Sequence, residues 1–262
     1  MSWYTPVAAE PDLSGELATA WTAQAGGEEH LLVPDGCVDV LWLSTGRLVV
    51  CGPETSGWSF SLPDGVEAVG VRLRPGRAAS VLGLDTPAAL NKRVDVEDVL
   101  GAREQRVLLE RLHEASGPHE RLSLLQRMVR DRAEARPALG VPESRSASTA
   151  DAVSRALTSA PETTVADLAR DAALSERQLH RRCVAAFGYG PAVLRRILRL
   201  QRLLRLARHP AATTDLSVLA AMAGYTDQSH LNRDSRALAG VPPSVLLGMQ
   251  LTDGVGDMPD AG

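Results

Sequence analysis

Two segments of this 262-residue chain concentrate side chains that can hydrogen-bond to the edges of nucleic-acid bases. Arginine can hold guanine with two hydrogen bonds, glutamine and asparagine can hold adenine, and serine or histidine can donate to a base or a phosphate. The candidates in the first segment are Arg177, Gln178, His180 and Arg181. The candidates in the second segment are Gln228, Ser229, Asn232, Arg233 and Arg236. These residue types predict contacts with DNA; the alternative interpretation is an ordinary solvated polar surface.

Apolar residues at intervals of three and four predict that both segments are helices whose polar side chains face outward. The first buried stripe consists of Leu179, Cys183, Ala186 and Phe187. The second consists of Leu231, Ser235 and Leu238. Ser175 can cap the first helix, and Thr226 or Asp227 can cap the second. His230 lies beside a core-facing leucine, so we expect it to bond to backbone rather than to a base.

Each of these helices is the second helix of a repeated pattern. The pattern consists of a short helix, a three-residue turn, a capped second helix, and then glycine and proline. The pattern occurs in TVADLARDAALSERQLHRRCVAAFGYGP and again in DLSVLAAMAGYTDQSHLNRDSRALAGVPP. It is typical of a helix-turn-helix unit. A helix expected over 191–208 joins the two units and, at about 27 Å, can hold them roughly one DNA turn apart. We expect some of its arginines, Arg199 among them, to contact phosphate.

Charge separates the two halves of the chain. Residues 1–150 carry 15 basic and 21 acidic side chains, whereas residues 151–250 carry 13 arginines and 8 acids. A basic region within an acidic protein favours a polyanionic partner for that region alone. No apolar run reaches the roughly 18–20 residues that span a membrane, and the N-terminus has no signal pattern. We therefore expect a cytoplasmic protein without a membrane partner.

At these residues the sequence resembles the AraC/XylS family of transcription regulators. The segments AGYTDQSHLNRDSRALAGVPPS, LARDAALSERQLHRRCVAAFGYGP and LRRILRLQRLLRLAR match that family in order and spacing, over about residues 150–248. The resemblance implies a bacterial-type regulator of transcription, activator or repressor, that binds double-stranded DNA. It also admits RNA polymerase, a small-molecule effector and a second copy of the chain, in a homodimer, as partners.

The second unit departs from the family pattern. The family usually has phenylalanine where this chain has Leu231 and Ser235, and often has it at Cys183. A buried serine loses apolar burial worth roughly 1.5–3 kcal/mol relative to phenylalanine. We expect Ser235 to donate to the carbonyl of Leu231, as mid-helix serines often do. The second helix should then dock less firmly and read bases more weakly, and Ser235→Phe should stabilise it.

The N-terminal half follows a different pattern. Between residues 28 and 74, short apolar runs alternate with Pro-Asp-Gly and Thr-Gly turns, which predicts four or five antiparallel strands. Helical periodicity follows over 101–115 and 118–135. The segments LLVPDGCVDVLW, CGPETS and VGVRLRPG resemble an uncharacterised sensor-type domain. We expect an α+β fold, with a small antiparallel β-barrel-like domain and its helices preceding an all-α domain.

Composition sets the expected domain boundaries. Residues 1–135 form a sensor or dimerisation domain, and residues 151–250 form the double helix-turn-helix domain. Residues 136–150 (RPALGVPESRSASTA) lose helical periodicity and are predicted to be a linker. Residues 251–262 are predicted to be a disordered acidic tail.

Three N-terminal residues, Trp42, Trp58 and Cys37, are candidates to line a ligand pocket, although each could instead fill the core. Cys37, with Cys51 from the next strand, could also be a reactive thiol, but small cysteines in strands are more often core residues. Three separated cysteines cannot supply a four-thiolate zinc site. The sequence also contains no phosphate loop and no nucleophile elbow.

We therefore expect no enzyme activity, no catalytic residue, no metal and no cofactor. Two alternatives stay open. In one, a thiol-reactive or enzymatic N-terminal domain is delivered to DNA by the helical domain. In the other, the helical domain is an interaction module that has lost DNA binding.

Overall fold

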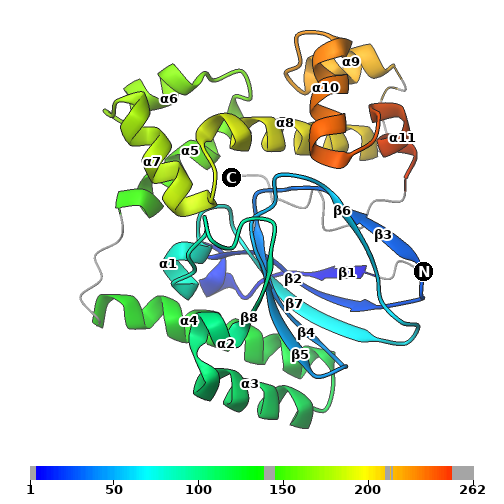
Figure 1. Cartoon of the computed structure of the whole chain (residues 1–262), viewed down its shortest axis with the longest axis vertical. Coiled ribbons are helices and arrows are strands. Elements are labelled where there is room, and N and C mark those ends of the chain that lie inside the picture. The colour runs from blue at the N-terminus through cyan, green and yellow to red at the C-terminus, as the bar shows by residue number, and fades with distance from the viewer. Residues whose placement is uncertain (1–3, 139–144, 210–212, 214, 250–262) are drawn as a thin grey trace.

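The computed structural model describes residues 4–138, 145–209, 213 and 215–249. Figure 1 shows an N-terminal half built on a β-sheet with helices against it, and a C-terminal half made of helices. The fold is α+β, as the sequence predicts. Among the described residues, no helix combines the length and apolarity needed to cross a bilayer.

The strands form two antiparallel sheets. The larger has six strands in the order β1-β2-β7-β4-β5-β8, and the smaller pairs β3 with β6. The six strands are β1 (Tyr4–Val7), β2 (Leu17–Gln24), β4 (Val38–Leu43), β5 (Arg47–Cys51), β7 (Glu67–Leu73) and β8 (Arg93–Asp95). The smaller sheet consists of β3 (Glu29–Leu32) and β6 (Trp58–Ser61).

Five strands, β3 to β7, occupy the region where four or five were predicted. The large sheet has two ends, at β1 and β8, so it is not a closed barrel and the term barrel-like fits only loosely. The remaining elements of this half are helical. They are η1 (Pro11–Leu13), α1 (Ala78–Leu82), α2 (Val96–Leu100), α3 (Ala102–Glu114) and α4 (Pro118–Ala138).

Alternation along β4 sends its side chains to opposite faces of the large sheet. Val38, Val40 and Trp42 join an apolar core together with leucines of α3 and α4. Asp39 and Leu41 face the other way, into a cavity that β3 and β6 also line. One strand therefore separates the core from the cavity.

Trp42 belongs to that core and does not line the cavity, which corrects its assignment as a ligand residue. Its side chain is 2% exposed. The His113 ring meets it edge-on at a centroid distance of 5.8 Å, and the Arg121 guanidinium lies 4.6 Å from the ring centroid. Its even position on β4 places it on the helix-covered face, whereas the cavity-facing positions are odd.

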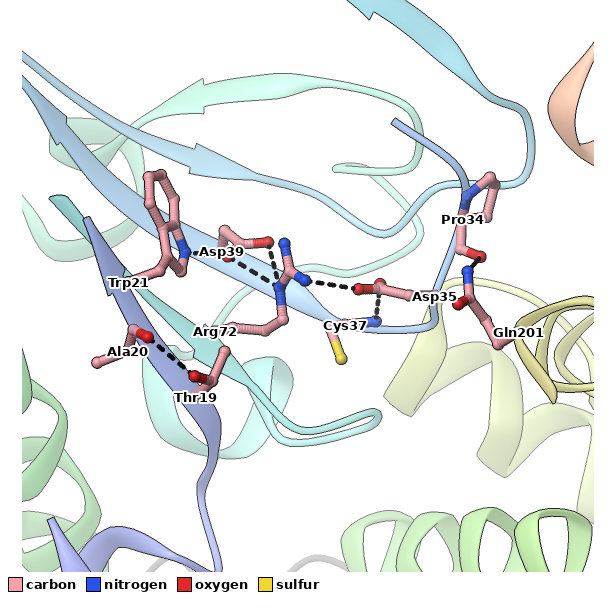
Figure 2. Close-up of polar contacts among 9 residues, drawn as sticks. All are labelled: Thr19, Ala20, Trp21, Pro34, Asp35, Cys37, Asp39, Arg72 and Gln201. Carbon is pink, nitrogen blue, oxygen red and sulfur yellow. Dashed lines mark hydrogen bonds and ion pairs between the residues drawn. The ribbon is translucent and has the colours of Figure 1, made fainter. Parts of the chain in front are cut away.

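Gly70 on β7 allows a close approach between neighbouring strands. Trp21 of β2 is its register partner, and a Cβ on Gly70 would lie only 2.3 Å from Cζ2 of that indole. With no side chain in the way, the indole Nε1–H reaches Asp39 on β4, where it donates to Oδ1 at 2.8 Å (Figure 2).

The helical half has the order of elements expected of two helix-turn-helix units. Its helices are α5 (Arg145–Ser159), α6 (Val165–Asp171), α7 (Glu176–Phe187), α8 (Pro191–Arg208), α9 (Leu216–Met222), α10 (Gln228–Ala239) and α11 (Pro243–Gly248). Ser175 caps α7, Asp227 rather than Thr226 caps α10, and Asp215 caps α9. In Figure 1, α6 and α7 lie toward one end of α8, and α9 and α10 lie toward the other.

The predicted linker is shorter than expected. Helix α4 continues to Ala138 and α5 starts at Arg145, so both helices enter the range 136–150, and residues 139–144 lie outside the described residues. The serine-rich start of α5 is helical because Ala147 and Ala150 bury their methyl groups. The predicted tail at 251–262 also lies outside the described residues.

Candidate nucleic-acid interface and adjoining cavity

The first candidate interface is the outer face of α7. Leu179, Cys183 and Phe187 are buried as predicted, while Arg177, His180 and Arg181 are exposed. The exposed group begins at the N-terminal end of the helix, the end that enters the major groove in helix-turn-helix proteins.

Gln178, on the same face, already has a structural task. Its Oε1 accepts the backbone N–H of Ser175 at 2.9 Å, and the Ser175 hydroxyl accepts the backbone N–H of Gln178 in return. This capping box supports the helix. The spacing S-x-x-Q is the signature of this second role, which the prediction of Gln178 as a DNA contact left out.

The outer face of α10 is the second candidate interface. Gln228, Ser229, Arg233 and Arg236 are exposed. Asn232 is half-buried, and its Nδ2 donates to the backbone carbonyl of Gln228 at 2.9 Å. All five predicted residues therefore lie on α10, and the Asn232 side chain is bonded to the backbone of that helix.

Arg199 cannot serve as the phosphate contact that the sequence predicts, because it is buried and 6% exposed. Its guanidinium donates to the carbonyl of Gly224 at 3.3 Å and lies 5.0 Å from the ring centroid of Tyr225. Burial lowers the pKa of this arginine. Arg199 connects α8 to the turn before α10, so its role is packing.

Asp234 is the residue that sequence reasoning missed. This carboxylate is 4% exposed, on the inner face of α10. Arg196 Nε donates to its Oδ1 at 2.7 Å, and Arg199 and the His230 ring approach Oδ2 at 3.8 and 3.7 Å. Its position three residues after Leu231 and four before Leu238 is the signal that could have revealed it.

Two further expectations for α10 need correction. Ser235 is fully buried, but its hydroxyl donates to the carbonyl of Val241 at 2.7 Å and not to that of Leu231. The His230 ring contacts side chains rather than backbone, with Nδ1 3.2 Å from the Thr226 hydroxyl. Both bonds tie α10 to the loops that flank it.

A cavity of about 300 Å³ lies between the two sheets of the N-terminal half. Cys37 and Trp58, both predicted as ligand residues, line it. The Arg93 guanidinium lies 3.5 Å from the ring centroid of Trp58 and is ion-paired with Glu54. Burial raises the pKa of Glu54 to about 7.

A buried ion cluster forms the polar wall of this cavity (Figure 2). The Nε of Arg72 lies 3.1 Å from Asp39 Oδ1, and its Nη1 lies 3.2 Å from Asp35 Oδ2. Burial raises the pKa of Asp35 despite this guanidinium. Asp35 Oδ1 also accepts the backbone N–H of Cys37 at 2.8 Å, which shapes the turn into β4.

The cysteines of this wall are poor candidates for thiol chemistry. Burial raises the pKa of Cys37 well above its usual value and that of Cys51 to about 12. The thiolate is the nucleophilic form, so both groups are held in their unreactive state. Their environment is that of core residues at the edge of a cavity.

The cavity wall also contacts the helical half. Gln201 Nε2 of α8 donates to the carbonyl of Pro34 at 2.7 Å, and Val33 belongs to the apolar core of the helical half (Figure 2). Elsewhere, the Thr86 hydroxyl donates to the carbonyl of Ala185 at the end of α7. The Gly57 N–H donates to the carbonyl of Leu238 in α10. The N-terminal half thus contacts both helix-turn-helix units.

Two family models match separate parts of the chain. Residues 168–248 match the model of a helix-turn-helix domain, and residues 5–95 match a domain of unknown function, DUF6597. No curated protein matches the chain.

Solved structures of ToxT from Vibrio cholerae resemble the chain at low identity. ToxT of strain O395 is 10% identical, with 94% of this chain and 97% of that chain covered and a TM-score of 0.47. ToxT of strain SCE256 with an unsaturated fatty acid bound is 12% identical, with 90% and 95% covered and a TM-score of 0.45. Similarity at this level assigns no ligand to this chain. The helix-turn-helix match and the two capped helix pairs lead to one conclusion: residues 168–248 of this chain form a helix-turn-helix domain.

Proposed function

We propose that the chain is a sequence-specific DNA-binding regulator of transcription in the cytoplasm, controlled by a small ligand through its N-terminal half. The observation that supports this most directly is the pair of capped helices, α7 and α10, that each bury one stripe and expose an arginine-bearing face. Arginine on an exposed helix face can reach guanine O6 and N7 in the major groove.

The domain division belongs to this proposal. Residues 1–135 would sense the ligand, and the double unit from α5 to α11 would bind double-stranded DNA. RNA polymerase and a second copy of the chain are the protein partners that such a regulator would need. The raised pKa values of Cys37 and Cys51 favour a ligand over a thiol signal.

The test is a DNA titration of the full chain against genomic fragments, followed by footprinting of the fragment bound most tightly. Arg181→Ala and Arg233→Ala should each weaken binding by about 1–3 kcal/mol and relax the preference at a few base pairs only. Arg106→Ala is the matched control, because Arg106 is an exposed arginine on α3.

Equal losses on every DNA sequence would show that Arg181 and Arg233 contact phosphate and not bases. Failure of the unaltered chain to bind any fragment would instead favour an interaction module that has lost DNA binding.

A further inference from the structure

The C-terminal ends of α7 and α10 both receive hydrogen-bond donors from the N-terminal half. The last four carbonyls of a helix have no partner within that helix. The buried Thr86 hydroxyl donates to the carbonyl of Ala185, in the last turn of α7, at 3.0 Å. The backbone N–H of Gly57 donates to the carbonyl of Leu238, in the last turn of α10. Each of the two candidate DNA-reading helices is therefore held at its C-terminal end by the other half of the chain.

Glycines allow these contacts to be close. Gly188 follows α7 with a φ of 81°, and a Cβ on it would lie 2.8 Å from the carbonyl oxygen of Thr86 and 3.1 Å from Cγ of Pro53. A Cβ on Gly57 would lie 3.2 Å from Cα of Ala239, the last residue of α10. Pro53 and Gly57 belong to one loop, so this loop reaches the ends of both helices.

The two segments that supply the donors are bonded to each other. The backbone N–H of Asn91 donates to the carbonyl of Pro53 at 2.8 Å, and its Oδ1 accepts the backbone N–H of Thr55 at 2.8 Å. Asn91 has a φ of 55°, in the left-handed region that asparagine tolerates better than most residues. We call residues 52–57 and 85–92 together the bracket. The bracket links the ends of α7 and α10 without passing through α8.

The bracket closes a ring of contacts around the two units, which lie toward opposite ends of α8 (Figure 1). With α8 as the sole link, each unit could rotate about its joint with that helix. A second link between α7 and α10 removes this freedom, because the two helices must then move together. Their N-terminal ends, which enter the major groove in helix-turn-helix proteins, lie about one helix length from the bracket, or roughly 18 Å. A small rotation at the bracket is therefore amplified at the ends that would read bases.

We propose that the bracket sets the spacing and mutual orientation of α7 and α10, with Gly57, Thr86 and Asn91 as its positioning residues. DNA whose two sub-sites match this spacing is bound most tightly, and DNA with another spacing is bound more weakly. The spacing preference rests on the proposed DNA-binding function, whereas the placement of the helices does not.

Spin labels test the placement of the helices without DNA. The labels are attached at Glu176→Cys and Ser229→Cys, near the N-terminal ends of α7 and α10, and pulsed electron paramagnetic resonance gives the distribution of distances between them. Gly57→Val should broaden this distribution, because the added side chain crowds the end of α10. Thr86→Val should also broaden it by removing the hydroxyl donor. Thr86→Ser keeps the donor and should retain the narrow distribution of the unaltered bracket.

Matched controls separate the bracket from general effects of substitution. A Cβ on Gly26 meets nothing within 4 Å, and Thr45 is exposed in the turn between β4 and β5, so Gly26→Val and Thr45→Val should leave the distribution unchanged. The chain without introduced cysteines is labelled in parallel, since its own three cysteines are buried or half-buried. A distribution that stays narrow in both Gly57→Val and Thr86→Val would overturn the proposal, because α8 would then place the helices alone.

The spacing preference is measured with unlabelled protein on the genomic fragment bound most tightly, and on the same fragment with one base pair inserted between its two footprints. The insertion should weaken binding of the unaltered chain at least about tenfold, or about 1.4 kcal/mol, because it shifts and rotates the second sub-site. It should weaken binding of Gly57→Val by less than about threefold, or about 0.7 kcal/mol. Equal losses in the two proteins would overturn the role in spacing. A chain that binds no fragment would count against the proposed function, while the labels still decide the placement of the helices.

Discussion

The two helix-turn-helix units share one order of elements but hold their second helices by different interactions. Helix α7 is held by apolar burial, with Leu179, Cys183 and Phe187 on its inner face. Helix α10 buries two polar groups, Asp234 and Ser235, in addition to its leucines. The comparison shows that a repeated motif fixes which face points inward, but not what kind of contact holds it.

This difference has physical consequences. Apolar burial is non-directional and depends little on pH or salt, whereas a buried carboxylate is stable only while its cations and hydrogen bonds stay in place. Arg196 and Arg199 of α8 supply those cations for Asp234. It is therefore the docking of the second unit that substitutions of charged residues and shifts in pH can alter.

The largest effect expected is loss of the apolar anchor of α7. Phe187 is 2% exposed, and Phe187→Ala should lower the free energy of unfolding by about 4 kcal/mol, because the removed ring leaves a cavity. Arg177→Ala, on the exposed face of the same helix, is the control and should change stability by less than about 0.5 kcal/mol. Denaturant titration measures both. A loss under about 1 kcal/mol for Phe187→Ala would contradict apolar docking of α7.

The next effect expected is loss of the buried carboxylate of α10. Asp234→Asn leaves Arg199 without its counter-charge in a buried position and should cost about 3 kcal/mol of unfolding free energy. Asp171→Asn is the matched control, since Asp171 forms an exposed ion pair with Arg170 that contributes little. If the two variants unfold at the same denaturant concentration, the Asp234 network does not hold α10.

Ser235 tests whether α10 has unfilled space. Ser235→Phe should lower stability by about 1–3 kcal/mol, because the hydroxyl is fully buried and already bonded to Val241. Ser235→Ala should cost about 1 kcal/mol by leaving that carbonyl without its donor. Sequence comparison alone favours the opposite sign for Ser235→Phe. A higher melting temperature for that variant would restore the idea of a loosely packed second unit.

The smallest effect expected is the contribution of His230, on α10, to the pH dependence of stability. Burial, and then the Arg199 charge, lower the pKa of His230 below its usual 6.5. As the pH decreases through 6.5, His230 therefore binds a proton in the unfolded chain but not yet in the folded chain. The free energy of unfolding should fall over this range of pH. His230→Gln should flatten this part of the curve. Unfolding midpoints measured between pH 5 and 8 decide it, and an unchanged slope in the variant would exclude His230 as the cause.

Much of the helical half was predictable because its signals are local. The caps at Ser175, Asp215 and Asp227 act within three residues of themselves, and the apolar stripes repeat every three or four residues. The same holds for the exposed arginines, whose direction follows from the stripe opposite them. The alternation of side chains along β4 also indicates that Trp42 and Asp39 face opposite sides of the strand. The prediction of Trp42 as a pocket residue did not take this alternation into account.

The contacts that depend on tertiary packing could not be predicted. Arg199 is as charged as its neighbours on α8, and only the approach of Gly224, Tyr225 and Asp234 buries it. The partner of Ser235 proved to be a carbonyl six residues away in the chain, beyond the reach of helical periodicity.

The sequence by itself determined the α+β class, the two capped helix pairs and the residues on their outer faces, because neighbouring residues carry that information. Only the tertiary structure decided that two sheets enclose a cavity, that Asp35, Asp39 and Arg72 meet in its wall, and that Pro34 rests on α8. Arg72 and Asp35 are 37 positions apart, and Gln201 and Pro34 are 167 apart. Such pairs form because burial of apolar surface brings distant segments together, and no local pattern specifies which segments those are.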